Sequence, residues 1–106
     1  VDTVDSYCVT KKIDHIDIMK VDTQMFEEQV LIGSKKMIEE QKIDAIELEI
    51  ILSSIYEKYF SISDLEKYLL PNGYRLSAMR LNNNNIFSGT VFFADTLFLK
   101  KNKFNI

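Results

Sequence analysis

The chain has little cysteine, no long apolar run and no concentration of positive charge. Cys8 is the single cysteine among 106 residues, so no disulfide can form within the chain, and a reducing, cytoplasmic setting is expected. No apolar run approaches the ~20 residues that span a bilayer, and no signal peptide opens the sequence. Net charge is −3, and the basic residues cluster only at Lys100, Lys101 and Lys103. Without a basic face or a spanning segment, neither nucleic acid nor a membrane is expected as a partner.

The remaining composition is that of an ordinary globular protein. Hydrophobic residues make up 46% of the chain and charged residues 27%. The length suits one domain over residues 1–106, and no linker or repeat divides it. The chain begins with Val1 and passes directly into structured-looking sequence, which suggests a piece of a longer protein; removal of an initiator methionine or cleavage of a tag would give the same start.

Residues 13–33 are the stretch around which the rest of the chain is organised. Residues 16–21 are apolar and β-branched, which predicts a buried strand. The apolar residues that follow have helical spacing, which predicts one helix over residues 23–41. Asp22 lies at the changeover, where a carboxylate can cap the helix. Ligands of open α/β sheets bind beyond the carboxyl ends of strands, so Asp22 is also the first candidate site residue, and the two roles are compatible.

A second strand is predicted over residues 43–52, and its charges are unusual for a buried strand. Glu47 and Glu49 share one face with Ala45, opposite a fully apolar face. One face of this strand is therefore expected to be wet or to open onto a polar site. Glu49, toward the carboxyl end, is the second candidate catalytic residue; the alternative is a solvated face that it shares with Glu47.

The other segments complete an α/β pattern. Thr3 is a plausible N-cap of a short first helix. Ser63 and Glu66 form a capping-box pattern at the start of a helix that a Pro-Asn-Gly segment ends. Strands are predicted over residues 74–80 and 96–100. This order predicts a sheet with parallel early strands and a C-terminal antiparallel hairpin.

Several segments resemble, in order and spacing, motifs of one enzyme family. They read Thr-Val-Asp-Ser-Tyr-Cys at residues 3–8, Ile-Asp-Ile-Met-Lys-Val-Asp at 16–22, Phe-Glu-Glu-Gln-Val-Leu-Ile-Gly-Ser at 26–34, Asn-Gly-Tyr-Arg-Leu at 72–76 and Asp-Thr-Leu-Phe-Leu at 95–99. Together they resemble the carboxyl-terminal half of FkbM-type methyltransferases, which are Rossmann-like enzymes that use S-adenosylmethionine. The resemblance runs over residues 1–101 and implies the second half of such a sheet.

The resemblance implies that the cofactor-binding half of the domain precedes this chain. In such enzymes a glycine-rich loop after the first strand holds S-adenosylmethionine, because the backbone must approach the ligand closely. Here Gly33, Gly73 and Gly89 stand alone, with no Gly-x-Gly. We therefore expect S-adenosylmethionine to bind the full-length parent, and expect this chain alone neither to bind it nor to transfer a methyl group. Transfer to a hydroxyl group of a small molecule or sugar is the implied reaction, and the cofactor-binding residues are unknown.

One departure from the family pattern suggests an alternative function. The family usually has "D-V-E-G" where this chain has Asp22-Thr23-Gln24-Met25. Asp22 is kept, but an amide replaces the next carboxylate and cannot take a proton at neutral pH. Met25 replaces a glycine and would crowd a ligand that needs close backbone approach. The alternative is a non-catalytic α/β interaction module derived from a degenerate methyltransferase.

No metal site is predicted. His15 precedes the first strand, at the end opposite a methyltransferase cleft, and is expected to be a surface or hinge residue. Cys8 lies on the apolar side of a short helix and is expected to be a small core residue. Neither has metal ligands nearby at a recognisable spacing, so no zinc site is expected.

An exposed strand edge is predicted to promote association. In the family's strand order, residues 16–21 would pair with a first strand from the upstream half of the domain. Without it, unpaired amides and carbonyls are left on an apolar edge. The handedness rule also places consecutive helices on one face and leaves the other uncovered, which is where Glu47 and Glu49 are expected to point. A homodimer or swapped assembly that covers the edge is therefore expected.

Overall fold

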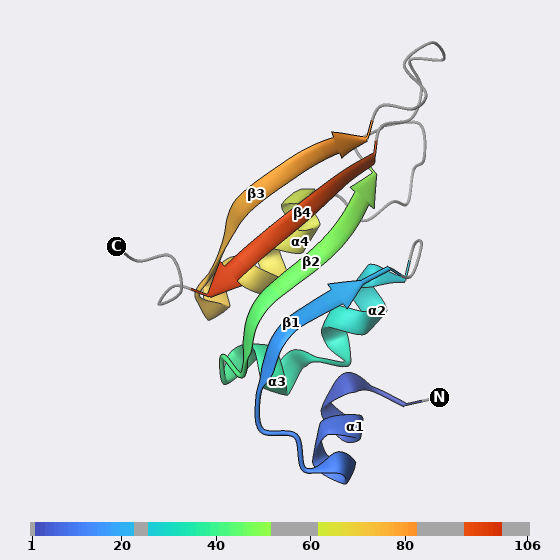
Figure 1. Cartoon of the computed structure of the whole chain (residues 1–106), viewed down its shortest axis with the longest axis vertical. Coiled ribbons are helices and arrows are strands. Elements are labelled where there is room, and N and C mark those ends of the chain that lie inside the picture. The colour runs from blue at the N-terminus through green and yellow to red at the C-terminus, as the bar shows by residue number, and fades with distance from the viewer. Residues whose placement is uncertain (1, 23–25, 52–61, 83–92, 101–106) are drawn as a thin grey trace.

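The computed structural model describes residues 2–22, 26–51, 62–82 and 93–100 (Figure 1). In chain order its elements are α1 (Val4–Lys11), β1 (Ile16–Val21), α2 (Glu27–Ile32), α3 (Lys35–Glu39), β2 (Ile43–Ile51), α4 (Ile62–Leu69), the 3₁₀ helix η1 (Leu70–Asn72), β3 (Tyr74–Asn82) and β4 (Phe93–Lys100). Within these ranges, no helix has both the length and the apolar character needed to cross a bilayer.

The four strands form one mixed sheet in the order β1-β2-β4-β3. β1 and β2 are parallel, whereas β4 is antiparallel to both β2 and β3. The predicted α/β class, the parallel early strands and the final antiparallel hairpin are all confirmed. β4 lies inside the sheet, between β2 and β3, so the last described strand separates two earlier ones.

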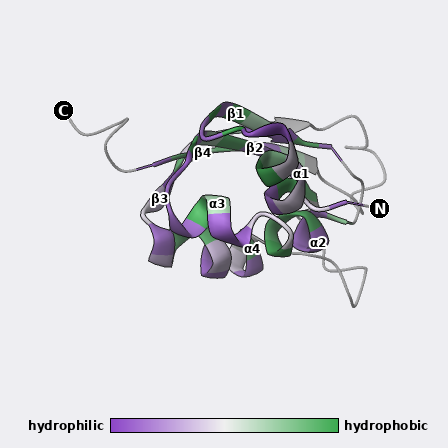
Figure 2. Cartoon of the chain, turned by 90° about the horizontal axis from the view of Figure 1, so that it is seen from below, coloured by the Kyte–Doolittle hydropathy of each residue, from purple (hydrophilic) through white to green (hydrophobic). Residues whose placement is uncertain are grey.

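The two faces of the sheet differ sharply. Figure 2 shows the helices gathered on one side of the sheet. Alternate residues of β2 and β4 point to that side and are at most 1% exposed: Ile46, Leu48, Ile50, Ala94, Thr96 and Phe98. Glu47 and Glu49 point to the opposite side and are partly exposed. The prediction that these carboxylates lie on a face without helices is therefore confirmed for the described residues.

The single helix predicted over residues 23–41 is wrong, because the chain breaks it into α2 and α3. The break is held by a residue of α1. The Asp5 carboxylate accepts hydrogen bonds from the backbone N–H of Lys36 at 2.8 Å and of Met37 at 3.0 Å, and so caps α3. The Asp5 N–H donates to the Gly33 carbonyl at 2.9 Å, and a Cβ on Gly33 would lie 3.1 Å from the Thr3 side chain. Contacts with α1 thus fix the turn between the two helices.

Helix ends agree with the local sequence in most places. Thr3 caps α1 by accepting from the Ser6 N–H at 3.0 Å, as predicted. Gly73 ends the α4–η1 segment in the left-handed conformation with φ of 88°, which glycine adopts without strain. The predicted N-cap at Ser63 is wrong, since α4 already begins at Ile62.

Candidate functional site

The carboxyl ends of β1 and β2 meet at a small acidic cavity. Parallel pairing sets Val21 of β1 opposite Leu48 of β2. The next residues along the two strands, Asp22 and Glu49, therefore lie close together. A cavity of about 70 Å³ is lined by Lys20, Val21, Asp22, Glu47, Glu49 and Asp95. Asp22 and Glu49, the two residues predicted from strand ends, are therefore brought to one place.

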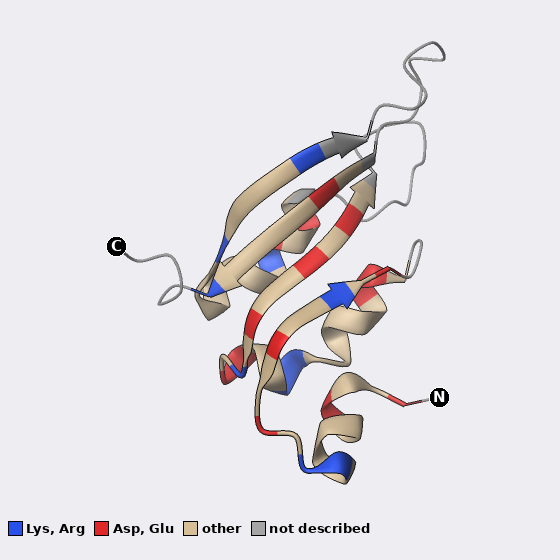
Figure 3. Ribbon diagram, viewed as in Figure 1, with Lys and Arg blue, Asp and Glu red and all other residues tan. Residues whose placement is uncertain are grey.

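Negative charge dominates this end of the sheet. Figure 3 shows acidic bands side by side on β2 and β4. Asp95 of β4 pairs in register with Glu49, and its Oδ2 lies 3.1 Å from an Arg80 nitrogen. Lys20 is the cross-strand neighbour of Glu47.

Glu49 is the carboxyl most affected by this environment. Burial raises its pKa above the ordinary value, and the negative charges of Asp95, Asp22 and Glu27 raise it further, against a lowering by Lys20. A carboxyl group with a raised pKa is a better proton acceptor at neutral pH, because it holds the proton more strongly. The cavity thus places Glu49, whose pKa is raised, beside the acidic side chain of Asp22.

Asp22 does not cap the helix that follows it. The N-cap of α2 is Phe26, and it makes no side-chain capping hydrogen bond. The helix-capping interpretation of Asp22 is therefore wrong for α2, and its exposed side chain lines the acidic cavity instead. Thr23, Gln24 and Met25 lie outside the described residues.

The acidic cavity by itself is too small for S-adenosylmethionine. Pockets that bind ligands of this size usually exceed ~300 Å³, whereas the acidic cavity has about 70 Å³. Gly33 is packed against Thr3, and Gly73 serves a turn in which a Cβ would strike the Gln41 side chain. Gly33 and Gly73 thus serve packing and a turn within the fold. Gly89 lies outside the described residues.

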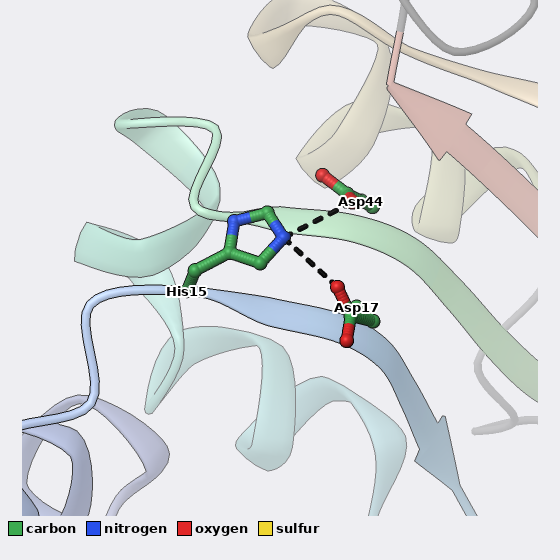
Figure 4. A group of neighbouring side chains, drawn as sticks. All are labelled: His15, Asp17 and Asp44. Atoms are coloured by element: carbon green, nitrogen blue, oxygen red, sulfur yellow. Dashed lines mark hydrogen bonds and ion pairs between the residues drawn. The ribbon is translucent and has the colours of Figure 1, made fainter.

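A second polar cluster lies at the opposite end of β1 (Figure 4). His15 Nε2 is 3.0 Å from Asp44 Oδ2 and 3.2 Å from Asp17 Oδ1. His15 thus has two neighbours of a type that can ligate metals, which the sequence spacing did not indicate. The linear spacing could not reveal them, because Asp44 is 29 residues away and is aligned only by the β1–β2 register. Cys8 is 4% exposed in the core, as predicted.

We expect Glu49→Gln to stabilise the protein at neutral pH. Because the pKa of Glu49 is raised in the folded state, folding favours the protonated carboxyl. The stability that this proton contributes is complete below the ordinary pKa of 4.5 and is lost as the pH rises through the folded-state pKa. Urea unfolding at about pH 4 and pH 7 should show that the advantage of Glu49→Gln over wild type grows with pH. Glu47→Gln is the matched control: it removes a charge facing Lys20 and should not stabilise. An equal advantage at both pH values would contradict the prediction.

Comparison with known proteins gives one match. The family described as "Methyltransferase FkbM domain" matches residues 1–76, which include both candidate carboxylates. The match ends in β3, so the motif at residues 95–99 lies beyond it. No curated protein and no solved structure matches the chain.

Proposed function

The chain belongs to the FkbM methyltransferase family, and on that basis we propose that it is the carboxyl-terminal portion of a domain that methylates a hydroxyl group of a small molecule or sugar. The family match over residues 1–76 is the observation that carries the methyltransferase part of this proposal. Membership of the family implies S-adenosylmethionine as the methyl donor. The portion proposed here supplies the acceptor end of the site.

Glu49 and Asp22 are the proposed catalytic carboxylates. Glu49 is placed to accept the proton that the acceptor hydroxyl must lose, and the raised pKa suits it to that role. Asp22 adds negative charge at the same cavity and offers a hydrogen-bond acceptor to a substrate hydroxyl. Asp22 directly follows β1 and Glu49 lies near the carboxyl end of β2, the end of a parallel pair at which α/β sheets bind ligands.

The cofactor site is assigned to residues upstream of this chain. Among the described strands, β1 pairs only with β2 and leaves its other edge open. An upstream strand fits that edge and would bring a glycine-rich loop next to Asp22.

Titration calorimetry with S-adenosylmethionine tests this proposal on two proteins, the present chain and a form extended upstream. We expect the cofactor to bind the extended form only. Binding to the present chain alone would overturn the assignment of the cofactor site. Binding to neither, with both folded, would overturn the methyltransferase proposal and favour the alternative below.

The alternative is a non-catalytic interaction module derived from the same family. Gln24 and Met25 favour it, because they replace the carboxylate and the glycine that the resemblance leads one to expect. Methyl transfer by the extended protein to a panel of hydroxylated acceptors distinguishes the two. Cofactor binding without any transfer would favour the module.

We further expect the present chain to form a homodimer through β1. The open edge of β1 offers unpaired backbone groups, and Ile18 on this strand is 65% exposed. Light scattering after size exclusion should give a dimer mass that falls toward the monomer on dilution. Ile18→Lys should shift the equilibrium to monomer, whereas Val9→Lys, at a 70% exposed position of α1, should not. A monomer at every concentration would refute this interface.

A further inference from the structure

We propose that His15, Asp17 and Asp44 bind a divalent transition-metal ion of the zinc type, which fastens the edge strand β1 to β2. This inference is independent of the proposed methyl transfer, because the cluster lies at the amino ends of the two strands and the acidic cavity lies at their carboxyl ends.

The sheet itself sets the two carboxylates side by side. Pairing of Ile16 with Ile43 and of Ile18 with Ala45 leaves Asp17 and Asp44 opposite each other on adjacent strands. The Ile16 N–H donates to the Lys42 carbonyl at 2.8 Å and fixes the start of this ladder. The cluster therefore depends on backbone pairing rather than on flexible loops.

The spacing of the ligand atoms suits a small metal ion. Ligands about 2.0–2.1 Å from an ion lie about 3.0 Å apart in octahedral and about 3.3 Å apart in tetrahedral geometry. His15 Nε2 is 3.0 Å from Asp44 Oδ2 and 3.2 Å from Asp17 Oδ1. The three ligand atoms all lie within 4.8 Å of one another. The Asp17 side chain is 91% exposed, so it can rotate to complete the set, with water filling the remaining positions.

Electrostatics also call for a cation at this point. Carboxylates opposite each other on neighbouring strands repel. His15 Nε2 is the atom that faces both carboxylates, whereas a metal ion would contact all three groups at once. Lys100 Nζ already lies 2.9 Å from Asp44 Oδ1, and its positive charge will lower the affinity for a second cation. A site of modest affinity follows.

The ligand types select among metals. One imidazole nitrogen with two carboxylate oxygens suits Zn²⁺ and similar ions, whereas Mg²⁺ and Ca²⁺ prefer oxygen ligands alone. We therefore expect Zn²⁺ to bind and Mg²⁺ at equal concentration to leave the site unchanged.

Calorimetric titration of ZnCl₂ into the whole chain, in a non-chelating buffer at neutral pH, tests the proposal. We expect saturable binding of one ion per chain. His15→Gln and Asp17→Asn should each weaken it at least tenfold, which is ~1.4 kcal/mol or more. Asp14→Asn, an exposed carboxylate next to the cluster, is the matched control and should bind as wild type does. Asp44 is left intact, because its contact with Lys100 ties it to the fold.

Thermal unfolding gives a second measurement. Zn²⁺ should raise the Tm of wild type and of Asp14→Asn, and should leave that of His15→Gln and Asp17→Asn unchanged, because an ion that binds the folded chain stabilises it. A Kd weaker than about 1 mM, an affinity that His15→Gln and Asp17→Asn leave unaltered, or equally tight Mg²⁺ binding would each overturn the proposal.

Discussion

Glu49→Gln is expected to lower kcat/KM for methyl transfer by ~10²–10⁴-fold in the upstream-extended protein, which is the range attributed to a general base. The amide keeps the size of the side chain but cannot accept the acceptor's proton. The same substitution should stabilise the fold at neutral pH, since it removes a partly exposed carboxylate held among negative neighbours. Loss of activity together with a gain in stability separates a catalytic role from damage to the fold.

Steady-state kinetics of methyl transfer, at saturating donor, provide the measurement. Asp22→Asn should cost less than Glu49→Gln, because Asp22 is exposed and is assigned to substrate contact. Glu40→Gln, an exposed carboxylate outside the acidic cavity, should leave the rate unchanged. Full activity in Glu49→Gln would remove this residue from the mechanism.

Phe98→Ala is expected to lower the free energy of unfolding by about 3–5 kcal/mol, which is typical for removing a buried aromatic ring. Phe98 is fully buried on β4 and pairs with Ile46 of β2 on one side and Leu76 of β3 on the other. Its loss leaves a cavity where the sheet meets the helices. Whole domains are stable by only ~5–15 kcal/mol, so a large share of the stability would be lost.

Urea unfolding of two further variants checks the explanation. Leu97→Ala changes the neighbouring residue on the same strand, which points to the face without helices and is partly exposed, so its cost should be clearly smaller. Phe98→Leu keeps most of the buried volume and should fall between wild type and Phe98→Ala. Equal losses in Leu97→Ala and Phe98→Ala would mean that the two faces of β4 contribute alike.

Strands could be predicted from the sequence because their signals are local. β1 has the predicted bounds, Ile16–Val21, and β2 matches to within a residue. The alternation of Glu47 and Glu49 with apolar residues also predicted which face of the sheet is uncovered. These patterns depend only on the two-residue period of a strand.

The division of residues 23–41 into α2 and α3 could not be predicted in the same way. The cap of α3 is Asp5, a residue of α1 that is 31 positions before Lys36. No pattern within the helical segment records this contact. The helical spacing of apolar residues shows that a segment can form a helix. Here a cap from a distant residue, Asp5, decides where the second helix begins.

The acidic cavity could be predicted from the sequence and the His15 cluster could not, for the same reason. Asp22 and Glu49 were predicted because both follow from their place at the ends of strands. The association of His15 with Asp44 depends on a register between strands 29 residues apart, which the composition of neither strand specifies.

The place of β4 in the sheet has a consequence for synthesis on the ribosome. β2 and β3 leave the exit tunnel before β4, yet β4 must come to lie between them. At ~5–20 residues per second, a nascent chain spends seconds with both strands made and their shared partner still missing. Direct pairing of β2 with β3 in that interval would trap a misfolded sheet. The domain can therefore complete its central pairing only after Lys100 has emerged, and the speed at which residues 83–100 are translated becomes a factor in its yield.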